Sequence, residues 1–429
     1  MNMEIILAVS FFVTLALGIP VAFCLGLTTL IALIFLGNVP LHLIPQRMFT
    51  GMDSFPIMAV PFFILAGELM NSAGITDRIV RFSTVLVGSI RGGLAHVNIV
   101  ASMFFAGISG SAVADTAALG SILIPAMKKD GYDKTFSAAV TAASSVIGPI
   151  IPPSIPVVIF ALVGSVSVGG LFLAGVVPGV LIGLGLMGVA YVISRKNDYG
   201  TKRPLPSFRE FLISLWGAII PLMMPIIIMG GILSGIFTPT EAAAVAVAYA
   251  LLVGHLILRT IKLKDLPKIF FKSMLTTSTI LFVMACANSL SWILSTEQIP
   301  QTLANVVSGI SDNPYILLLL LNLILLVVGC FLEGIASIII MVPILYPIAM
   351  HAGIHPLHFG SIVVTNLMIG LITPPLGLCL FVVCSVADVD FVKLVRSIWP
   401  FLLVEVAALT VVTYFPQIVL FIPHYFGFN

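Results

Sequence analysis

The heptapeptide Ile147-Gly-Pro-Ile-Ile-Pro-Pro153 lies inside the apolar run 136–163, and a similar one, Ile369-Gly-Leu-Ile-Thr-Pro-Pro375, lies inside the apolar run 359–386. The two heptapeptides match at five of seven positions, 222 residues apart from Ile147 to Ile369. Proline lacks the amide donor of the helix ladder and crowds the carbonyl one turn back, so consecutive prolines interrupt a helix. We therefore predict two broken helices.

The same offset relates residues over a longer stretch of the chain. Further glycines and prolines coincide without a gap, namely Gly107 with Gly329, Pro125 with Pro347, Gly131 with Gly353, and Pro178 with Pro400. Several matches in one register indicate an internal duplication.

The composition is that of a membrane protein. Of 429 residues, 60% are hydrophobic and only 8% are charged, whereas soluble domains carry about 25% charged residues. Apolar runs such as Leu171–Ser194 and Ile398–Ile422 are long enough to span a bilayer. The first apolar run has no basic region before it, so we expect no cleaved signal. We interpret the five cysteines as apolar packing residues and find no nucleic-acid signature.

The basic residues indicate the topology, because cytoplasmic loops are enriched in Lys and Arg. A threading through the basic clusters places 18 of the 19 Lys and Arg residues in the cytoplasm, with Arg47 as the exception. It predicts that both termini lie on the external side. The clusters used are Lys128, Lys129 and Lys134; Arg195, Lys196, Lys202, Arg203 and Arg209; Arg259, Lys262, Lys264, Lys268 and Lys272; Lys393 and Arg396.

Two pairs of apolar runs have the length of re-entrant hairpins. The pair 92–108 and 112–127 has basic residues at both ends, whereas the pair 314–330 and 336–350 lies in the Lys- and Arg-free region between Asp312 and His358. A run of 17 residues makes about 25 Å of helix, short of the ~30 Å hydrocarbon core. Two full crossings would also fit the charge count of the second pair. Hairpins entering from opposite sides fit both charge and length, which makes the repeat inverted.

Inverted repeats with broken helices are typical of secondary transporters. The first hairpin turns through Ala106–Thr116 and contains Asp115, and the second turns through Gly329–Ser337 and contains Glu333, which we take as the corresponding acid. A carboxylate at membrane depth suggests a bound cation or a protonated acid, and the carbonyls freed by each break can bind Na⁺. A simple proline kink, and capping of the second hairpin helix by either acid, are the structural alternatives.

Three other acids are interpreted as structural. Glu68 lies in an apolar run, Glu241 reads as a helix-start residue after Thr238, and Glu405 lies in the last span, where it can face a partner helix.

The chain resembles the large membrane subunit of a tripartite ATP-independent periplasmic (TRAP) transporter, a family that includes sialic acid transporters. Four segments carry the resemblance: Pro61–Glu68, Gly107–Asp115, Gly148–Pro153 and Gly370–Pro375. The resemblance covers essentially the whole chain. It implies an all-α, inverted-repeat, elevator-type permease in which a transport domain slides against a scaffold. We divide the chain into scaffold helices (1–91), a first transport-domain segment (92–170), scaffold and connecting helices (171–312), a second transport-domain segment (313–390) and a C-terminal scaffold helix (391–429).

The resemblance also implies the site residues. The first sodium site matches Ser109, Ser111, Asp115, Gly148, Ile151 and Pro153. The second matches Phe331, Glu333, Gly370, Thr373 and Pro375, with Thr373 in place of Ile151. Ser144, Ser145, Ser154 and Asn366 are predicted to contact the substrate from their location between the tips.

The implied function is sodium-coupled symport of an organic anion, sialic acid or a C4-dicarboxylate, with Na⁺ as coupling ion and no cofactor. The implied partners are a small four-helix membrane subunit and a periplasmic substrate-binding protein, and the implied location is the bacterial inner membrane.

Three alternatives remain at the level of sequence. A sodium/dicarboxylate symporter that needs no binding protein has a related fold. An intramembrane serine protease would explain the G-x-S-G motif Gly107-Ile-Ser-Gly110, although His96 and His255 lie toward segment ends. Broken helices also line passive channels.

Overall fold

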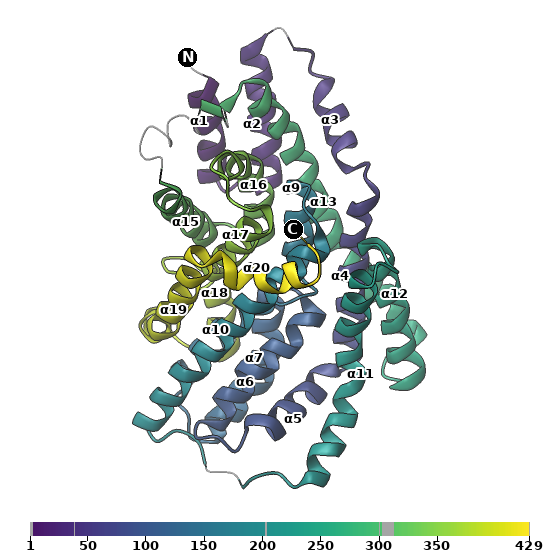
Figure 1. Ribbon diagram of the computed structural model, residues 1–429, viewed down its shortest axis with the longest axis vertical. Coiled ribbons are helices and arrows are strands. Elements are labelled where there is room, and N and C mark those ends of the chain that lie inside the picture. Colours follow the sequence, from purple (N-terminus) through teal and green to yellow (C-terminus); the bar gives the residue numbers. More distant parts are fainter. Residues whose placement is uncertain (1–2, 38, 202–203, 300, 303–312, 429) are drawn as a thin grey trace.

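The computed structural model describes residues 3–37, 39–201, 204–299, 301–302 and 313–428. Lys202, Arg203 and Asp312, which the topology argument uses, lie outside this portion of the chain. The described residues form helices and no strand (Figure 1). Eight of these helices are long and apolar enough to cross a membrane. The structure therefore confirms an all-α, multi-helix membrane protein.

The first repeat contains a helical hairpin followed by an interrupted helix. Its elements are α6 (Gly93–Ser109), α7 (Ala112–Lys129), α8 (Lys134–Ser145), α9 (Ile155–Gly164) and the long α10 (Val168–Lys196). The interruption between α8 and α9 contains the predicted proline pair, so the first break is confirmed.

The second repeat has the same order of elements. They are α15 (Pro314–Phe331), α16 (Gly334–His351), α17 (Pro356–Gly370), α18 (Leu378–Ala387) and α19 (Phe391–Tyr414). The helix starts Ala112 and Gly334 keep the offset found in the sequence, as do Lys134 and Pro356. In Figure 1 the α6–α7 hairpin lies in the lower half of the molecule and the α15–α16 hairpin in the upper half, as expected for an inverted repeat.

The remaining helices complete two groups. The outer group comprises α1 (Met3–Ala16), α2 (Val21–Leu36), α3 (Leu43–Met52), α4 (Ala59–Ser72), α5 (Ile75–Val87), α11 (Phe208–Leu233), α12 (Pro239–Leu251) and α13 (Leu266–Thr296). Short turns at Phe55–Met58, Leu252–Ile257 and Leu263–Asp265 join some of them. The hairpin group comprises α6–α10, α15–α19 and α20 (Pro416–Tyr425). The groups meet where α4 and α5 pack on α6, α4 on α9, and α13 on α16.

One predicted span is wrong in its bounds. The apolar run Ile398–Ile422 is not a single helix, because α19 already begins at Phe391 and ends at Tyr414, and α20 begins at Pro416. Proline has no amide to continue the ladder and excludes the helical conformation from the residue before it. Phe415 accordingly adopts φ −121°, ψ 71°. Hydrophobicity alone could not reveal this corner.

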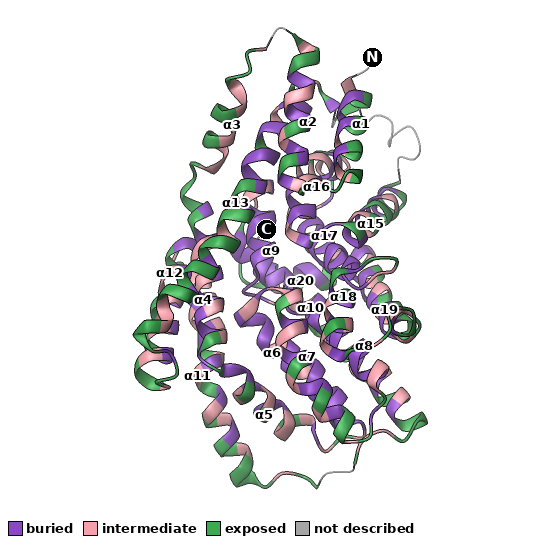
Figure 2. Ribbon diagram, turned by 180° about the vertical axis from the view of Figure 1, so that it is seen from behind, coloured by how far each residue is buried: buried purple, intermediate pink, exposed green. Residues whose placement is uncertain are grey.

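Burial separates the interior of the hairpin group from the lipid-facing surface. Figure 2 shows buried residues along α8, α9 and α17, whereas α3 has none. Large apolar side chains such as Phe12, Phe49 and Trp216 are exposed on the outer group, as in proteins surrounded by hydrocarbon. Four of the five cysteines are buried, in agreement with a packing role. Helix α1 lies at the end of the molecule opposite α5 (Figure 1), and the side of the membrane on which each terminus lies stays a prediction.

Candidate functional site

The first hairpin tip rests on the first helix break. Helix α6 ends at Gly110, which has φ 62°, a conformation that glycine adopts without steric cost. A Cβ atom at Gly110 would lie 3.3 Å from the backbone nitrogen of Ile155, whereas one at Gly107 would lie 2.6 Å from Cγ of Pro225 in α11 and at an ordinary 3.5 Å from the Pro152 carbonyl oxygen. Gly110 therefore allows the tip to approach the start of α9, and Gly107 allows it to approach α11.

Asp115 lies at the centre of this junction. Its side chain is 0% exposed, and neither carboxylate oxygen accepts a hydrogen bond of ordinary geometry in the described chain, although the Ser109 hydroxyl is near enough to interact with it. A Cβ atom at Gly148 would collide with Oδ2 of Asp115, so the carboxylate lies directly against the break. A buried carboxylate without a partner is unfavourable unless a cation or a proton neutralises it.

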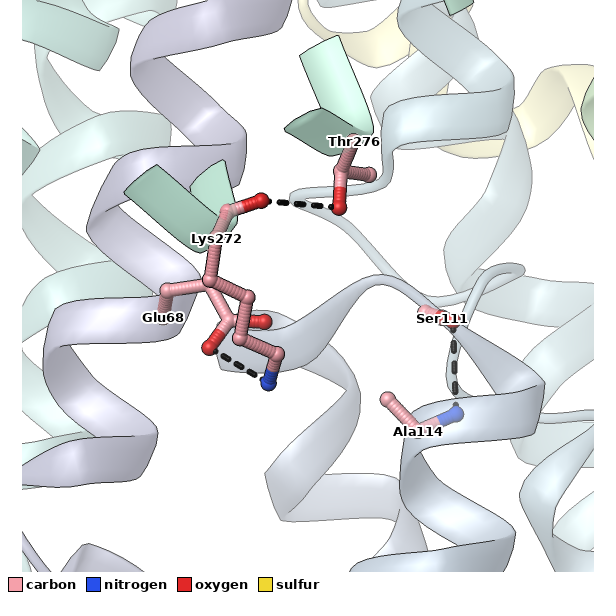
Figure 3. A network of polar contacts seen from close by, with 5 residues as sticks. All are labelled: Glu68, Ser111, Ala114, Lys272 and Thr276. Atoms are coloured by element: carbon pink, nitrogen blue, oxygen red, sulfur yellow. Dashed lines mark hydrogen bonds and ion pairs between the residues drawn. The ribbon is translucent and has the colours of Figure 1, made fainter. Parts of the chain in front are cut away.

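Ser111, rather than Asp115, caps α7. Its Oγ accepts a hydrogen bond from the Ala114 amide at 3.4 Å (Figure 3), and its own amide donates to Ser109 Oγ at 3.3 Å. Capping by Asp115 is therefore wrong, and the Asp115 carboxylate is not occupied by the helix terminus.

The first break brings together a subset of the predicted site residues. Ser109, Ser111, Asp115 and Gly148 lie at the junction of tip and break. The Ile151 side chain packs against Gly179 of α10, and the Ile150 carbonyl faces Gly175 of the same helix. The assignment of Ile151 to the sodium site concerns its backbone carbonyl and stays a prediction. Pro153 is buried within the break and follows a cis Pro152–Pro153 bond.

The second tip meets the second break more tightly. A Cβ atom at Gly370 would lie 2.6 Å from Cα of Gly329, so the two backbones touch. The Cys330 thiol donates to the Thr373 carbonyl at 3.1 Å, and the Gly377 amide donates to the Cys330 carbonyl at 3.3 Å. Two carbonyls that a cation could use here are thus already bonded.

The other predicted residues of the second site differ in their contacts and exposure. The Thr373 hydroxyl donates to the Ile369 carbonyl in its own helix at 2.9 Å. Phe331 is 56% exposed, and Pro375 is also exposed. The sequence missed Gly329, Cys330 and Gly377 as contact residues, although the match of Gly329 with Gly107 was a usable signal.

Glu333 caps α16, as one of the structural alternatives predicted. One carboxylate oxygen accepts from the Ile335 amide at 2.9 Å and from the Ala336 amide at 3.1 Å. In the repeat register Glu333 is equivalent to Ser111, the cap of α7, and Asp115 is equivalent to Ser337. The prediction that Glu333 corresponds to Asp115 is therefore wrong, because the two acids occupy different turns of their helices.

The four residues predicted to contact substrate are all buried and make internal hydrogen bonds. Ser102 donates to Ser144 at 2.9 Å, and Ser144 can donate to Asn98 Oδ1 at 3.3 Å. In the second repeat Asn366 Nδ2 donates to Asn322 Oδ1 at 2.6 Å. Ser145 donates to the Thr141 carbonyl at 2.6 Å, and Ser154 caps α9 through the Val157 amide at 3.3 Å.

Ser144 and Asn366 occupy equivalent positions, so each break is tied to its hairpin by a matched polar cluster. The sequence did not single out Asn98 and Asn322. An asparagine within an apolar run was the signal that could have found them.

An ion pair lies on the outer group beside the first tip. Lys272 of α13 contacts Glu68 of α4 at 2.9 Å (Figure 3), and a Cβ atom at the adjacent Gly67 would lie 2.9 Å from the Ile108 carbonyl oxygen. A cavity of about 440 Å³ opens here, and its lining includes Glu68, Lys272 and Lys268. Glu68 is therefore held in an ion pair, and its structural role stays a prediction. Glu241 is a helix-start residue, as predicted, because it accepts from the Thr238 amide at 2.8 Å at the start of α12.

Comparisons with known proteins agree with this geometry. Residues 8–418 match the family model described as "Tripartite ATP-independent periplasmic transporter, DctM component". The chain is 45% identical to the sialic acid TRAP transporter large permease protein SiaM of Vibrio cholerae, over 95% of this chain and 96% of that protein. It is 40% identical to the C4-dicarboxylate TRAP transporter large permease protein DctM of Pseudomonas aeruginosa, over 94% and 95% of the two chains.

A solved structure shares the fold. The YdaH transporter of Alcanivorax borkumensis superimposes with a TM-score of 0.63 at 15% identity, covering 89% of this chain and 88% of that one. The relatives above are permeases, which removes the protease alternative raised by the G-x-S-G motif. The chain therefore belongs to the DctM component family of TRAP transporters and is a multi-pass large permease.

Proposed function

We propose that this permease uses a sodium gradient to take up an organic anion, and that Asp115 is the central ligand of its first sodium site. The observation that carries the proposal is the fully buried Asp115 carboxylate, unpartnered in the described chain and pressed against Gly148 of the helix break. Sodium is a hard cation that takes oxygen ligands. A carboxylate, the hydroxyls of Ser109 and Ser111 and backbone carbonyls of the break are such ligands, and all of them belong to the junction of tip and break.

The proposal includes a second sodium site at the second tip, with a different ligand set. Because the Glu333 carboxylate caps α16, this site would depend on the Thr373 hydroxyl oxygen and on backbone carbonyls, including those that already accept one hydrogen bond and keep a second lone pair. We expect it to be weaker than the first, since it has no free carboxylate.

The packing supports an elevator-like movement of the hairpin group against the outer group. Helices α10 and α19 pack on α8, α17 and each other, as well as α10 on α6. We therefore include α10 and α19 in the moving body, although the sequence-based division assigned both to the scaffold. The outer group would then form the static body, which packs against α6, α9 and α16 of the moving body.

The substrate class follows from the relatives and belongs to the proposal. Their names specify sialic acid, C4-dicarboxylates and, for an Escherichia coli relative 36% identical to this chain, 2,3-diketo-L-gulonate. All are organic acids or their salts. We propose a carboxylate-bearing anion, with sialic acid first, delivered by a periplasmic binding protein to a complex of this chain with a small membrane subunit in the bacterial inner membrane.

The test is reconstitution of the permease in proteoliposomes with the small membrane subunit, followed by uptake of radiolabelled sialic acid and succinate. We expect uptake only with an inward Na⁺ gradient and the cognate binding protein outside. Uptake that is unchanged when choline replaces Na⁺ would refute sodium coupling. Equal uptake without the binding protein would favour the symporter alternative instead.

A further inference from the structure

Glu405 is a second buried acid that the sodium sites do not use. It lies in the middle of α19, its side chain is 0% exposed, and neither carboxylate oxygen has a hydrogen-bond partner in the described chain. Its equivalent in the first repeat is Gly183 of α10. The acid is therefore specific to the second half and does not follow from the duplication.

The surroundings of Glu405 are apolar. One turn earlier, the Phe401 ring packs on Phe136 of α8, with 5.9 Å between ring centroids. The adjacent Val404 fills the space left by Gly185 of α10. One turn later, Ala408 and Leu409 are buried. An ionised carboxylate in such surroundings is far less stable than in water, and such a group takes its neutral form unless a counter-charge is present.

Among the described residues, no basic side chain pairs with Glu405 from the helices packed on α19, which are α8, α10, α15, α17, α18 and α20. Helix α15 contributes Tyr315 near its start, whose ring packs on Tyr414 at the end of α19 with 5.9 Å between ring centroids. Helix α18 contributes Cys379, whose thiol lies within electrostatic range of Glu405 as well as of Asp115 and Glu333. Helix α17 contributes His358, whose Nε2 is bonded to the Val412 carbonyl at 2.8 Å. The remaining titratable groups lie near helix ends: Lys134 of α8, Tyr191, Arg195 and Lys196 of α10, Cys384 of α18, Lys393, Arg396 and Tyr414 of α19, and His424 and Tyr425 of α20.

The backbone around Glu405 decides between a metal ion and a proton. Asp115 faces a helix break, where the backbone leaves the helix ladder. Glu405 lies within α19, from Phe391 to Tyr414, which packs on the continuous α10. Each of these helices contains a proline, Pro400 in α19 and Pro178 in α10, and the carbonyls that the prolines leave without an amide donor, at Arg396 and Ala174, lie nine residues before Glu405 and its equivalent Gly183. The carbonyls next to Glu405 accept hydrogen bonds within the helix. Because Na⁺ needs several oxygen ligands at once, a single carboxylate on a closed helix does not provide a site, whereas one proton neutralises it.

We propose that Glu405 is a proton-binding site in the core of the hairpin group, in addition to the sodium sites. The protonated carboxyl is neutral, and its hydroxyl can donate to a helix carbonyl one turn back, as Thr and Ser side chains do in membrane helices.

The test is infrared spectroscopy of the purified full-length permease in lipid nanodiscs, at neutral pH, in NaCl and in choline chloride. A protonated carboxyl has a C=O stretch that is separate from the carboxylate bands and shifts on H/D exchange. We expect this band in wild type in NaCl and its loss in Glu405→Gln, which keeps the side-chain shape. In choline chloride a protonated Asp115 adds a band of its own, so the Glu405 contribution is the difference between wild type and Glu405→Gln in the same salt, and we expect that difference in both salts. Glu241→Gln, which changes an exposed capping acid, is the matched control and should retain the band.

Two results would overturn the proposal. The first is a band that is unchanged in Glu405→Gln. The second is a band assigned to Glu405 that appears in choline chloride and vanishes in NaCl, because Na⁺ would then be the ligand. If Glu405→Gln does not fold, Glu405→Met, which replaces the acid by an apolar side chain of similar length, takes its place with the same expectations.

Discussion

The two junctions of hairpin tip and helix break have the same plan but use their acids differently. At the first, a serine caps α7 and leaves Asp115 unpartnered in the described chain, against Gly148. At the second, Glu333 itself caps α16, and the break is bonded to the tip through Cys330. The duplicated hairpin and broken helix therefore present one carboxylate that is available to a cation and one that caps a helix. The presence of an acid at each tip does not distinguish the two roles. They differ because Glu333 immediately precedes the first residue of its helix, whereas Asp115 lies within its helix, four residues after the cap Ser111.

The largest expected effect separates the two acids. Asp115→Ala should lower sodium-dependent uptake by about 100-fold, because removing the charged partner of a buried ion costs about 3 kcal/mol. Glu333→Ala should leave sodium dependence intact and lower stability by about 1 kcal/mol through loss of the cap. Uptake kinetics in proteoliposomes and thermal unfolding measure the two quantities. Equal loss of sodium dependence in both variants would remove the distinction.

A second comparison concerns the glycines of the two breaks. In Gly148→Ala the new methyl group would displace the Asp115 carboxylate, so we expect sodium affinity to fall by about 10-fold with a smaller change in stability. In Gly370→Ala the methyl group meets the backbone of Gly329, which cannot rotate away, so we expect a stability loss of about 1–3 kcal/mol. Sodium titration and thermal unfolding of both variants test this. The opposite assignment of effects would contradict it.

The smallest expected effects on sodium binding concern the polar clusters that tie each hairpin to its broken helix. Asn98→Ala and Asn322→Ala each leave buried polar groups without a hydrogen-bond partner, so we expect each to lower the free energy of unfolding by about 1–3 kcal/mol. We expect neither to change sodium affinity at equal folded fraction. The exposed Asn288 offers a control, since its side chain makes a long bond to the Arg47 carbonyl at 3.5 Å. A shift in sodium affinity in Asn98→Ala would mean that the cluster belongs to the site.

Much of the fold was predictable because glycine and proline act locally. The prolines of residues 147–153 and 369–375 had to interrupt helices, and the basic residues around the first hairpin separated it from the second. The corner at Pro416 was hidden by the hydrophobicity of its neighbours, which is the same for one long span and two short helices.

The roles of the acids were less predictable, because they depend on contacts between segments far apart in the chain. Ser111 and Glu333 are equivalent in the repeat register, so an ungapped alignment of the two tips would have identified the caps. That Asp115 faces Gly148, and that Glu405 faces no partner in the described chain, follows only from how the helices pack.

Sodium binding to the purified permease tests the central claim most directly. A ligand that binds only the folded state at 100 times its dissociation constant stabilises it by about 2.7 kcal/mol. We predict that NaCl, relative to choline chloride, raises the unfolding temperature of wild type and of Glu333→Ala by similar amounts, and raises that of Asp115→Ala by much less. An equal sodium-dependent rise in Asp115→Ala would show that the unpartnered carboxylate is not the sodium ligand.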